Sequence, residues 1–172
     1  KLKLLLSVLS LLMKKKNEGN WYYEQVELGY NYRMNDIQAR LGLSQLKKLS
    51  KFLHRRKQIA KLYKNEFKDL PIKSQSINDG SISSYHLFVI EINKGKKLKQ
   101  KIYNILRRNK ILVNVHYIPI HLQPYYMKKF GFRKGQFQFA EDYYDKAISL
   151  PIYYSLKKKE VLRVVNLIKK NL

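Results

Sequence analysis

The stretch from Asn35 to Pro71 constrains the fold more than any other part of the sequence. Asn35 suits the N-cap of a helix, and Gln38 three residues later completes the capping-box pattern. Pro71 cannot continue a helix, so the helix is expected to end by Leu70. A single long helix is therefore predicted to lead into the rest of the chain. Its apolar positions recur at helical spacing, at Ile37, Leu41, Leu46, Leu49, Leu53, Ile59, Leu62, Tyr63 and Phe67.

After Pro71 the sequence alternates between strand-like and helix-like segments. This order predicts a small α/β domain with a sheet of about three strands and covering helices. The pattern does not say whether the strands run parallel or antiparallel. The first predicted strand is nearly all apolar, which predicts that both of its faces are covered. The predicted strands are Tyr85–Ile92, Ile111–Ile118 (closed by Pro119) and Ile148–Pro151; the helices are Lys97–Arg108 (with Asn109 as C-cap), Phe139–Ala147 and an amphipathic helix from Val161 to Leu172.

Composition narrows the function classes. With 172 residues and 45% hydrophobic side chains, the chain can bury a core. The absence of cysteine excludes disulfide scaffolds, thiolate zinc sites and cysteine nucleophiles, and it is compatible with a cytoplasmic location. The apolar run from Leu4 to Met13 is shorter than the roughly 20 residues that span a bilayer, so no membrane partner is expected.

The formal net charge of +24 has two interpretations. A surplus of this size attracts phosphates, which makes a basic nucleic-acid-binding protein the alternative function. The positive charges are scattered along the sequence, however, and no RNP-like, helix-turn-helix or finger pattern is present. Solvated surface and biased residue usage are therefore the favoured interpretation, and no nucleic-acid partner is expected.

The segment before the long helix carries a candidate anion site. Asn31 offers amide donors, Arg33 a planar guanidinium, and Tyr30 and Tyr32 hydroxyl groups with stacking surface. Because these residues precede a helix N-terminus, they could hold a phosphorylated ligand. The alternative is an ordinary capped helix start with a surface arginine.

A second candidate cluster surrounds Pro119 and contains His116, Tyr117, His121 and Gln123. Strand alternation would turn His116 and Tyr117 to opposite faces unless the strand breaks at the proline. Two histidines suggest a metal site, but no third ligand stands nearby at ligand spacing, so no metal is expected. His86, by contrast, is expected to be structural.

Three ordered stretches resemble a known family. They are GYNYRMNDIQARLGLSQLKKL after Leu28, VNVHYIPIHLQPYYMKKFGF from Val113 to Phe132, and FAEDYYDKAISLPIYYSL from Phe139 to Leu156. They resemble the DegT/DnrJ/EryC1/StrS aminotransferases, and the resemblance covers roughly Trp21 to the C-terminus. The second and third stretches look most like the pseudaminic-acid branch, the UDP-4-amino-4,6-dideoxy-N-acetyl-β-L-altrosamine transaminases.

The resemblance implies a fold-type I enzyme that uses pyridoxal 5′-phosphate and acts as a homodimer. This chain would be its C-terminal small domain. The enzyme would transfer an amino group from glutamate to the C4 ketone of a UDP-linked 4-keto-6-deoxy sugar. Asn31 would donate a hydrogen bond to the cofactor phosphate of the neighbouring subunit, and Arg33 would lie near the nucleotide diphosphate. The substrate pocket would be lined by His116, Tyr117 and His121.

The sequence also departs from that family. The family's Schiff-base lysine precedes a Gly-Glu-Gly-Gly-like turn, and no such motif occurs here. No catalytic residue is therefore assigned, and the chain alone is expected to be inactive, as if it began after a truncation or a disrupted reading frame. The expected organisation is an unmatched segment 1–20, an interface loop and long linking helix over 21–70, and a small α/β domain over 71–172.

Overall fold

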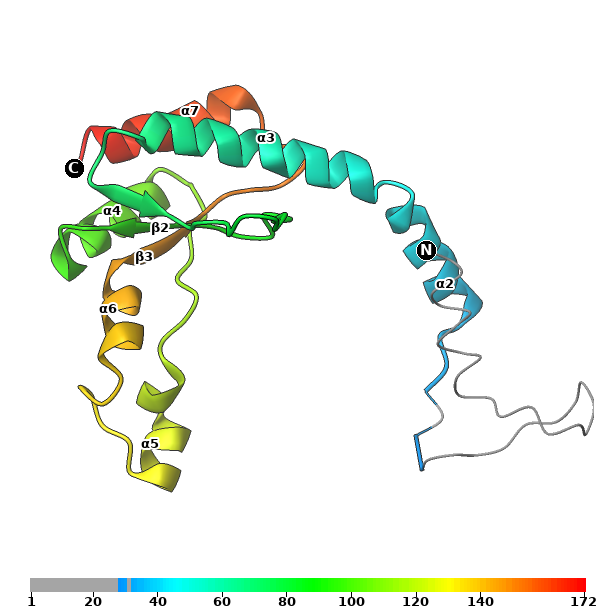
Figure 1. The fold of residues 1–172 in the computed structure, drawn as a ribbon, viewed down its shortest axis with the longest axis horizontal. Helices are drawn as coiled ribbons and strands as arrows, with labels where there is room; N and C mark the ends of the chain where they lie inside the picture. The colour runs from blue at the N-terminus through cyan, green and yellow to red at the C-terminus, as the bar shows by residue number, and fades with distance from the viewer. Residues whose placement is uncertain (1–27, 31) are drawn as a thin grey trace, which may run out of the picture. The chain divides into compact units, whose positions relative to one another are not determined.

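The computed structural model describes residues 28–30 and 32–172 (Figure 1). The chain divides into two compact units, residues 1–42 and 43–172. Helices and strands follow one another in the order α2 (Asp36–Leu46), α3 (Leu49–Phe67), β1 (Ile72–Ser74), β2 (Phe88–Ile92), α4 (Lys96–Arg108), η1 (Ile120–Leu122), α5 (Pro124–Phe130), α6 (Gln138–Lys146), β3 (Ala147–Leu150) and α7 (Lys158–Lys169).

The predicted capping box at the start of α2 is confirmed. The Asn35 side-chain oxygen accepts the backbone N–H of Gln38 at 2.9 Å, and the Asn35 N–H donates to the Gln38 side-chain oxygen at 3.1 Å. These reciprocal bonds give hydrogen-bond acceptors to two backbone N–H groups at the helix start, those of Asn35 and Gln38. The helix has no buried residue in this structure.

The prediction of one uninterrupted helix up to Leu70 is wrong. The chain forms two helices, α2 and α3, separated at Lys47 and Lys48. The N–H of Lys48 bonds the Gln45 carbonyl at 2.9 Å, a tighter three-residue bond that ends α2 before Phe52 resumes the α-helical pattern. Apolar spacing continues through so short a break, and for this reason the sequence pattern does not reveal it.

The sheet has three strands in the order β1-β2-β3, and both pairs are antiparallel. Phe88, Ile90 and Ile92 of β2 are fully buried, whereas Val89 and Glu91 between them are half-buried. The expectation that both faces of this strand are covered therefore holds fully for one face and only in part for the other, which gives the alternation of a sheet with one core face.

The predicted strand over Ile111–Ile118 is also absent. Only Asn114 pairs with the sheet, in an isolated antiparallel bridge to Ser149 of β3. Directly after it, the Asn114 side-chain oxygen accepts the N–H of Val115 at 2.8 Å. That local bond competes with ladder pairing and turns the segment away from the sheet. The third strand is β1, which is too short to show a period in the sequence.

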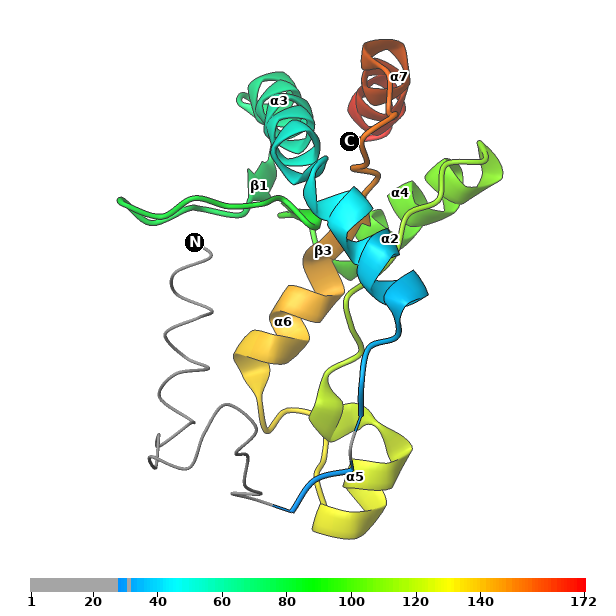
Figure 2. The same cartoon turned by 90° about the vertical axis from the view of Figure 1, so that its right-hand side faces the viewer.

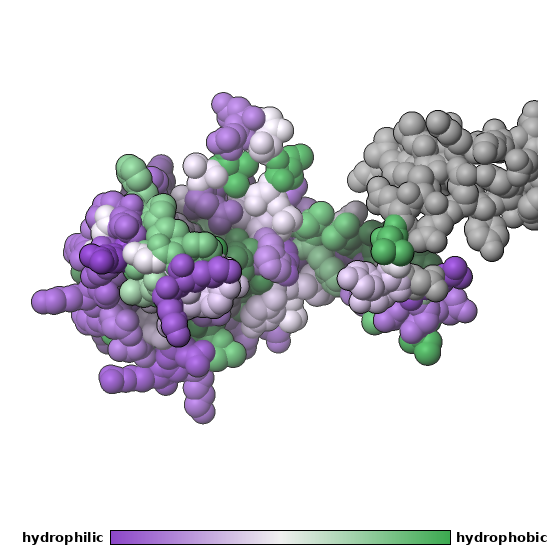
Figure 3. All heavy atoms as spheres, turned by 90° about the horizontal axis from the view of Figure 1, so that it is seen from below, coloured by the Kyte–Doolittle hydropathy of each residue, from purple (hydrophilic) through white to green (hydrophobic). Residues whose placement is uncertain are grey.

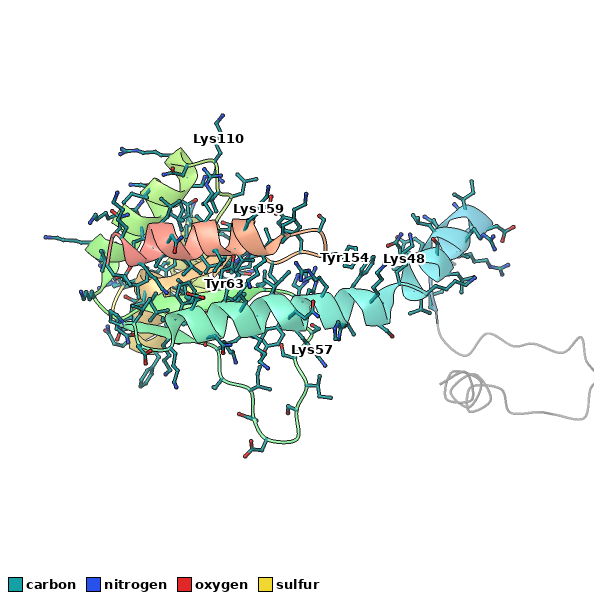
Figure 4. All side chains as sticks on the ribbon, turned by 90° about the horizontal axis from the view of Figure 1, so that it is seen from above. Lys48, Lys57, Tyr63, Lys110, Tyr154 and Lys159 are labelled. Carbon is teal, nitrogen blue, oxygen red and sulfur yellow. The ribbon has the colours of Figure 1, made fainter. Side chains whose placement is uncertain are left out.

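The core lies between the sheet and the helices α3, α4 and α7, and Figures 1 and 2 show α3 beside α7 over the sheet. Tyr63 stands at its centre, on the side of α3 that faces α7 (Figure 4). Its ring stacks on Phe88 of β2 at 5.0 Å, and its hydroxyl donates to the Pro151 carbonyl at 3.1 Å. The helices α4, α6 and α7 and the strand β3 confirm the sequence predictions to within a few residues at their ends.

Candidate functional site

The segment that carries His116 and Tyr117 is held by side chains buried in the core and by backbone hydrogen bonds to the sheet. Ile111 and Val113 are buried in the core. The Asn114 N–H donates to the Ser149 carbonyl at 3.3 Å, and the Ser149 N–H donates to the Asn114 carbonyl at 2.8 Å. These two backbone bonds fix where the segment leaves the edge of β3. The residues that follow are thereby presented at a defined place beside the sheet.

His116 is oriented by a buried serine that the sequence analysis missed. Its Nδ1 lies 2.7 Å from the Ser149 hydroxyl oxygen, and Ser149 is only 6% exposed. A short hydrogen bond between Nδ1 and a strand residue holds the ring in one orientation and leaves Nε2 available to a different partner. Nothing in the sequence around Ser149 signals this, because the two residues are 33 positions apart.

His116 and Tyr117 lie together, although strand alternation would have separated them. Their ring centroids are 4.6 Å apart in an edge-to-face arrangement. The segment is not a regular strand, so the period of two does not apply. Tyr117 is 71% exposed, which leaves both its ring face and its hydroxyl accessible. The pair therefore places an imidazole and an exposed phenol side by side.

His121 has a different environment. It is 6% exposed, and its Nε2 donates to the Glu141 carboxylate at 2.9 Å. The same carboxylate oxygen accepts the Gly135 N–H at 2.7 Å. The hydrogen bond from His121, aided by backbone N–H groups, lowers the pKa of the Glu141 carboxyl group below its usual 4.5. His121 thus ties η1 to α6 and to the turn at Gly135, and Glu141 is a second residue that sequence reasoning missed.

The helix α5 lies next to η1 and exposes much of its surface. None of its residues is buried, and Tyr125 and Phe130 are more than half exposed. Figure 3 views the domain from this end and shows hydrophobic and hydrophilic side chains intermixed over the visible face of residues 43–172.

The candidate anion segment before α2 is described in part. Asn31 lies outside the described residues. Tyr30 and Tyr32 stack with ring centroids 5.5 Å apart, and Arg33 is exposed. These residues belong to the unit of residues 1–42, whereas His116 and Tyr117 belong to the unit of residues 43–172.

The described part of the chain was searched for a cluster of metal ligands and for a membrane-spanning helix. Among residues 28–30 and 32–172, no group of three or more His, Cys, Asp or Glu residues could hold a metal ion. In the same residues, no helix is long and apolar enough to cross a membrane.

The fold and the anchored His116–Tyr117 segment can now be compared with known proteins. A model of the DegT/DnrJ/EryC1/StrS aminotransferase family matches residues 3–169. The chain belongs to this family. The match also includes most of residues 1–20, upstream of the stretch from Trp21 that carries the resemblance.

Individual relatives agree with the family assignment. The uncharacterized protein MJ1066 of Methanocaldococcus jannaschii is 43% identical over 90% of this chain and 41% of its own length. A UDP-4-amino-4,6-dideoxy-N-acetyl-beta-L-altrosamine transaminase of Campylobacter jejuni is 35% identical over 81% of this chain and 37% of its own length. The chain thus spans about two fifths of the length of these relatives.

Solved structures agree with the fold. Helicobacter pylori PseC, an aminotransferase involved in the biosynthesis of pseudoaminic acid, matches with a TM-score of 0.75 and 33% identity, over 92% of this chain and 42% of PseC. Spr1654 from Streptococcus pneumoniae in its PLP-form matches with a TM-score of 0.76 and 30% identity, over 88% of this chain and 40% of Spr1654. The small α/β domain is therefore the C-terminal portion of a sugar-aminotransferase fold.

Members of the family use pyridoxal phosphate, and the described residues do not form a site for it by themselves. A Schiff-base lysine is typically desolvated, and Lys99 of α4 comes nearest to that property, because burial lowers the pKa of its ammonium group. Its Nζ, however, lies 4.7 Å from the centre of the Tyr144 ring, in the packing between α4 and α6. The carboxylate that acts on it, Asp145, is itself paired with Lys96 at 3.3 Å. Lys99 is a structural lysine.

Proposed function

We propose that this chain is the substrate-binding C-terminal part of a nucleotide-sugar aminotransferase. The complete enzyme would use pyridoxal phosphate to transfer an amino group from glutamate to the C4 ketone of a UDP-linked 4-keto-6-deoxy sugar, as in pseudaminic acid biosynthesis. The similarity to the Campylobacter jejuni altrosamine transaminase and to Helicobacter pylori PseC supports this substrate. The observation that carries the proposal is the His116–Tyr117 pair, oriented by Ser149 and open to a ligand.

Within this proposal, His116 and Tyr117 contact the sugar. An imidazole nitrogen and a phenolic hydroxyl donate and accept hydrogen bonds to ring hydroxyl and amide groups, and an exposed aromatic face can pack against the apolar face of a deoxy sugar. Burial of such a small apolar face excludes water from the reacting carbon. The Ser149 hydrogen bond to Nδ1 supports a fixed ring orientation, which is what substrate positioning requires.

His121, first expected to touch the substrate, is proposed to line the pocket from behind. Its Nε2 is already used by Glu141, and its ring is buried beside Phe137 with centroids 4.7 Å apart. In this role it holds η1, and with it the residues after Pro119, against α6. Loss of His121 would then shift the pocket wall and would not remove a direct hydrogen bond to the sugar.

Asn31 and Arg33 are proposed to act on phosphate groups. An amide donor suits the cofactor phosphate, and a planar guanidinium suits the nucleotide diphosphate. The complete enzyme is proposed to be a homodimer in which these groups serve the neighbouring active site. The apolar side chains that α2 exposes, such as Ile37 and Leu41, support a covered position for this helix in that assembly.

A chimera tests the proposal. Residues 28–172 replace the matching C-terminal part of Helicobacter pylori PseC, and glutamate-dependent amination of its UDP-4-keto sugar is measured. The chimera is expected to be active, and Tyr117→Ala should reduce kcat/KM about tenfold or more, since one lost contact to the transition state costs over 1 kcal/mol. Tyr153→Ala, at an exposed position outside this segment, is the matched control. A folded chimera that binds the cofactor and aminates only a GDP-linked keto sugar would refute the UDP assignment.

A further inference from the structure

The loop between β1 and β2 is fixed on the side of α3, away from the residues proposed to bind the sugar. The Arg56 guanidinium of α3 donates through Nη1 to the carbonyls of Tyr85 and His86, at 3.0 and 2.9 Å. Within the loop, the Tyr85 N–H donates to the Ser83 hydroxyl at 3.1 Å. These bonds hold the returning part of the loop in one arrangement beside the helix. His86 takes part in this contact through its backbone carbonyl.

A groove separates this loop from α3, and three lysines line its helical wall. Lys57, Lys61 and Lys64 are spaced four and three residues apart, so they share one face of the helix and extend over about 10 Å of its axis. The wall that the loop provides contains Ser81 and Ser83 together with the apolar side chains of Ile77 and Ile82 and the ring of Tyr85. Figure 4 shows Lys57 on the side of α3 from which the loop projects.

The lining of the groove has a net positive charge, because it contains three lysines and no acidic residue. In the described part of the chain, none of the three amino groups lies within 4.0 Å of an acidic oxygen. Glu66, the nearest acidic residue along α3, is paired with Lys169 of α7 at 2.7 Å. Like charges at this spacing on a helix repel one another. An anion bound in the groove would attract all three ammonium groups and would offset the repulsion between them.

One lysine is also held in place. The Lys64 Nζ lies 5.7 Å from the centre of the Tyr85 ring, a cation–π contact between the helix and the anchored loop. The groove therefore combines a preformed wall, a partly oriented amine and two hydroxyl groups. A solvated lysine face of a helix would have none of these.

We propose that this groove binds a di- or triphosphate group. Lysine ammonium groups act as point charges toward phosphate oxygens, and serine hydroxyls add hydrogen bonds to them. Three amines along about 10 Å of helix suit a chain of linked phosphates better than a single phosphate ion. The group is carried by a nucleotide or is free in solution. This site does not depend on the proposed aminotransferase activity, and it involves none of the residues assigned to it.

Titration calorimetry of the full chain at physiological salt tests the proposal, with sodium tripolyphosphate and ATP as separate ligands. The variant Lys57→Gln/Lys61→Gln/Lys64→Gln is expected to bind tripolyphosphate about 100-fold more weakly, at about fivefold for each lost charge contact. The matched control removes three exposed lysines elsewhere on the same domain. This control variant is Lys97→Gln/Lys134→Gln/Lys158→Gln, and its affinity for tripolyphosphate should stay within about twofold of that of the parent chain.

A second variant separates a built groove from general positive charge. Arg56→Gln releases the loop but keeps all three lysines, and it should weaken tripolyphosphate binding about tenfold, whereas Arg108→Gln on α4 removes the same charge without effect. Circular dichroism verifies that each variant is folded. Tighter binding of ATP than of tripolyphosphate identifies a nucleotide as the source, and equal binding identifies the free polyphosphate. Equal losses in both triple variants, or binding of single-stranded RNA without binding of tripolyphosphate, would overturn the proposal.

Discussion

Replacement of Ser149 by alanine tests whether the serine positions His116. The hydrogen bond is short, 2.7 Å, and the serine is buried, while His116 is half-buried. A neutral hydrogen bond of this kind contributes about 1 kcal/mol to the free energy of unfolding. With a urea slope of about 1.5 kcal/mol per molar, the unfolding midpoint should fall by roughly 0.7 M. The backbone bridge between Ser149 and Asn114 is retained, so the fold itself should persist.

The assay is a double-mutant cycle by urea unfolding, with Ser149→Ala, His116→Ala and the pair. A coupling energy of about 1 kcal/mol is expected if the two side chains interact directly. Long-range ¹H–¹⁵N spectra of the imidazoles report the tautomer, and only the signals of His116 should change in Ser149→Ala. Ser155→Ala, at an exposed serine in the turn before α7, is the matched control. Additive losses, with an unchanged His116 spectrum, would refute the positioning role.

Three further outcomes follow from the same structure. The hydrogen bond from His121 lowers the pKa of the Glu141 carboxyl group. The ionised Glu141 therefore stabilises the fold above pH 4.5, and this contribution is lost as the pH falls through the lowered pKa. Glu141→Gln should remove this part of the acid sensitivity in urea unfolding from pH 7 to pH 3, and equal pH dependence in both proteins would contradict it. Ile90→Ala should cost about 3 kcal/mol in the same assay at pH 7, since Ile90 is fully buried at the centre of the sheet; a loss below about 1 kcal/mol would contradict its central place. The chain alone should retain no pyridoxal phosphate after desalting, and a stable bound absorbance abolished by Lys99→Gln would contradict the structural role given to that lysine.

The local features of this protein were predictable from its sequence. The capping box of Asn35 and Gln38 acts within one helical turn, and the apolar spacing of α7 records a helix with one buried face. Ordered motifs around Tyr117 and across Phe139–Leu156 identified the family, which the match over residues 3–169 confirms. Each of these signals lies among neighbours in the chain, where sequence patterns are informative.

Contacts between distant residues were decided only by the tertiary structure. Ser149 orients His116 from 33 residues away, and Glu141 engages His121 across 20 residues, so neither partner has a local signature. The segment around Asn114 has a high β-propensity, yet it pairs with the sheet through one bridge only. The local hydrogen bond of the Asn114 side chain then turns the chain away from the sheet. Likewise, lysines that look like ordinary surface charge along α3 line a groove only because the loop between β1 and β2 folds back against them. Chain entropy and packing, which depend on the whole fold, determine such pairings, and no short window of sequence contains that information.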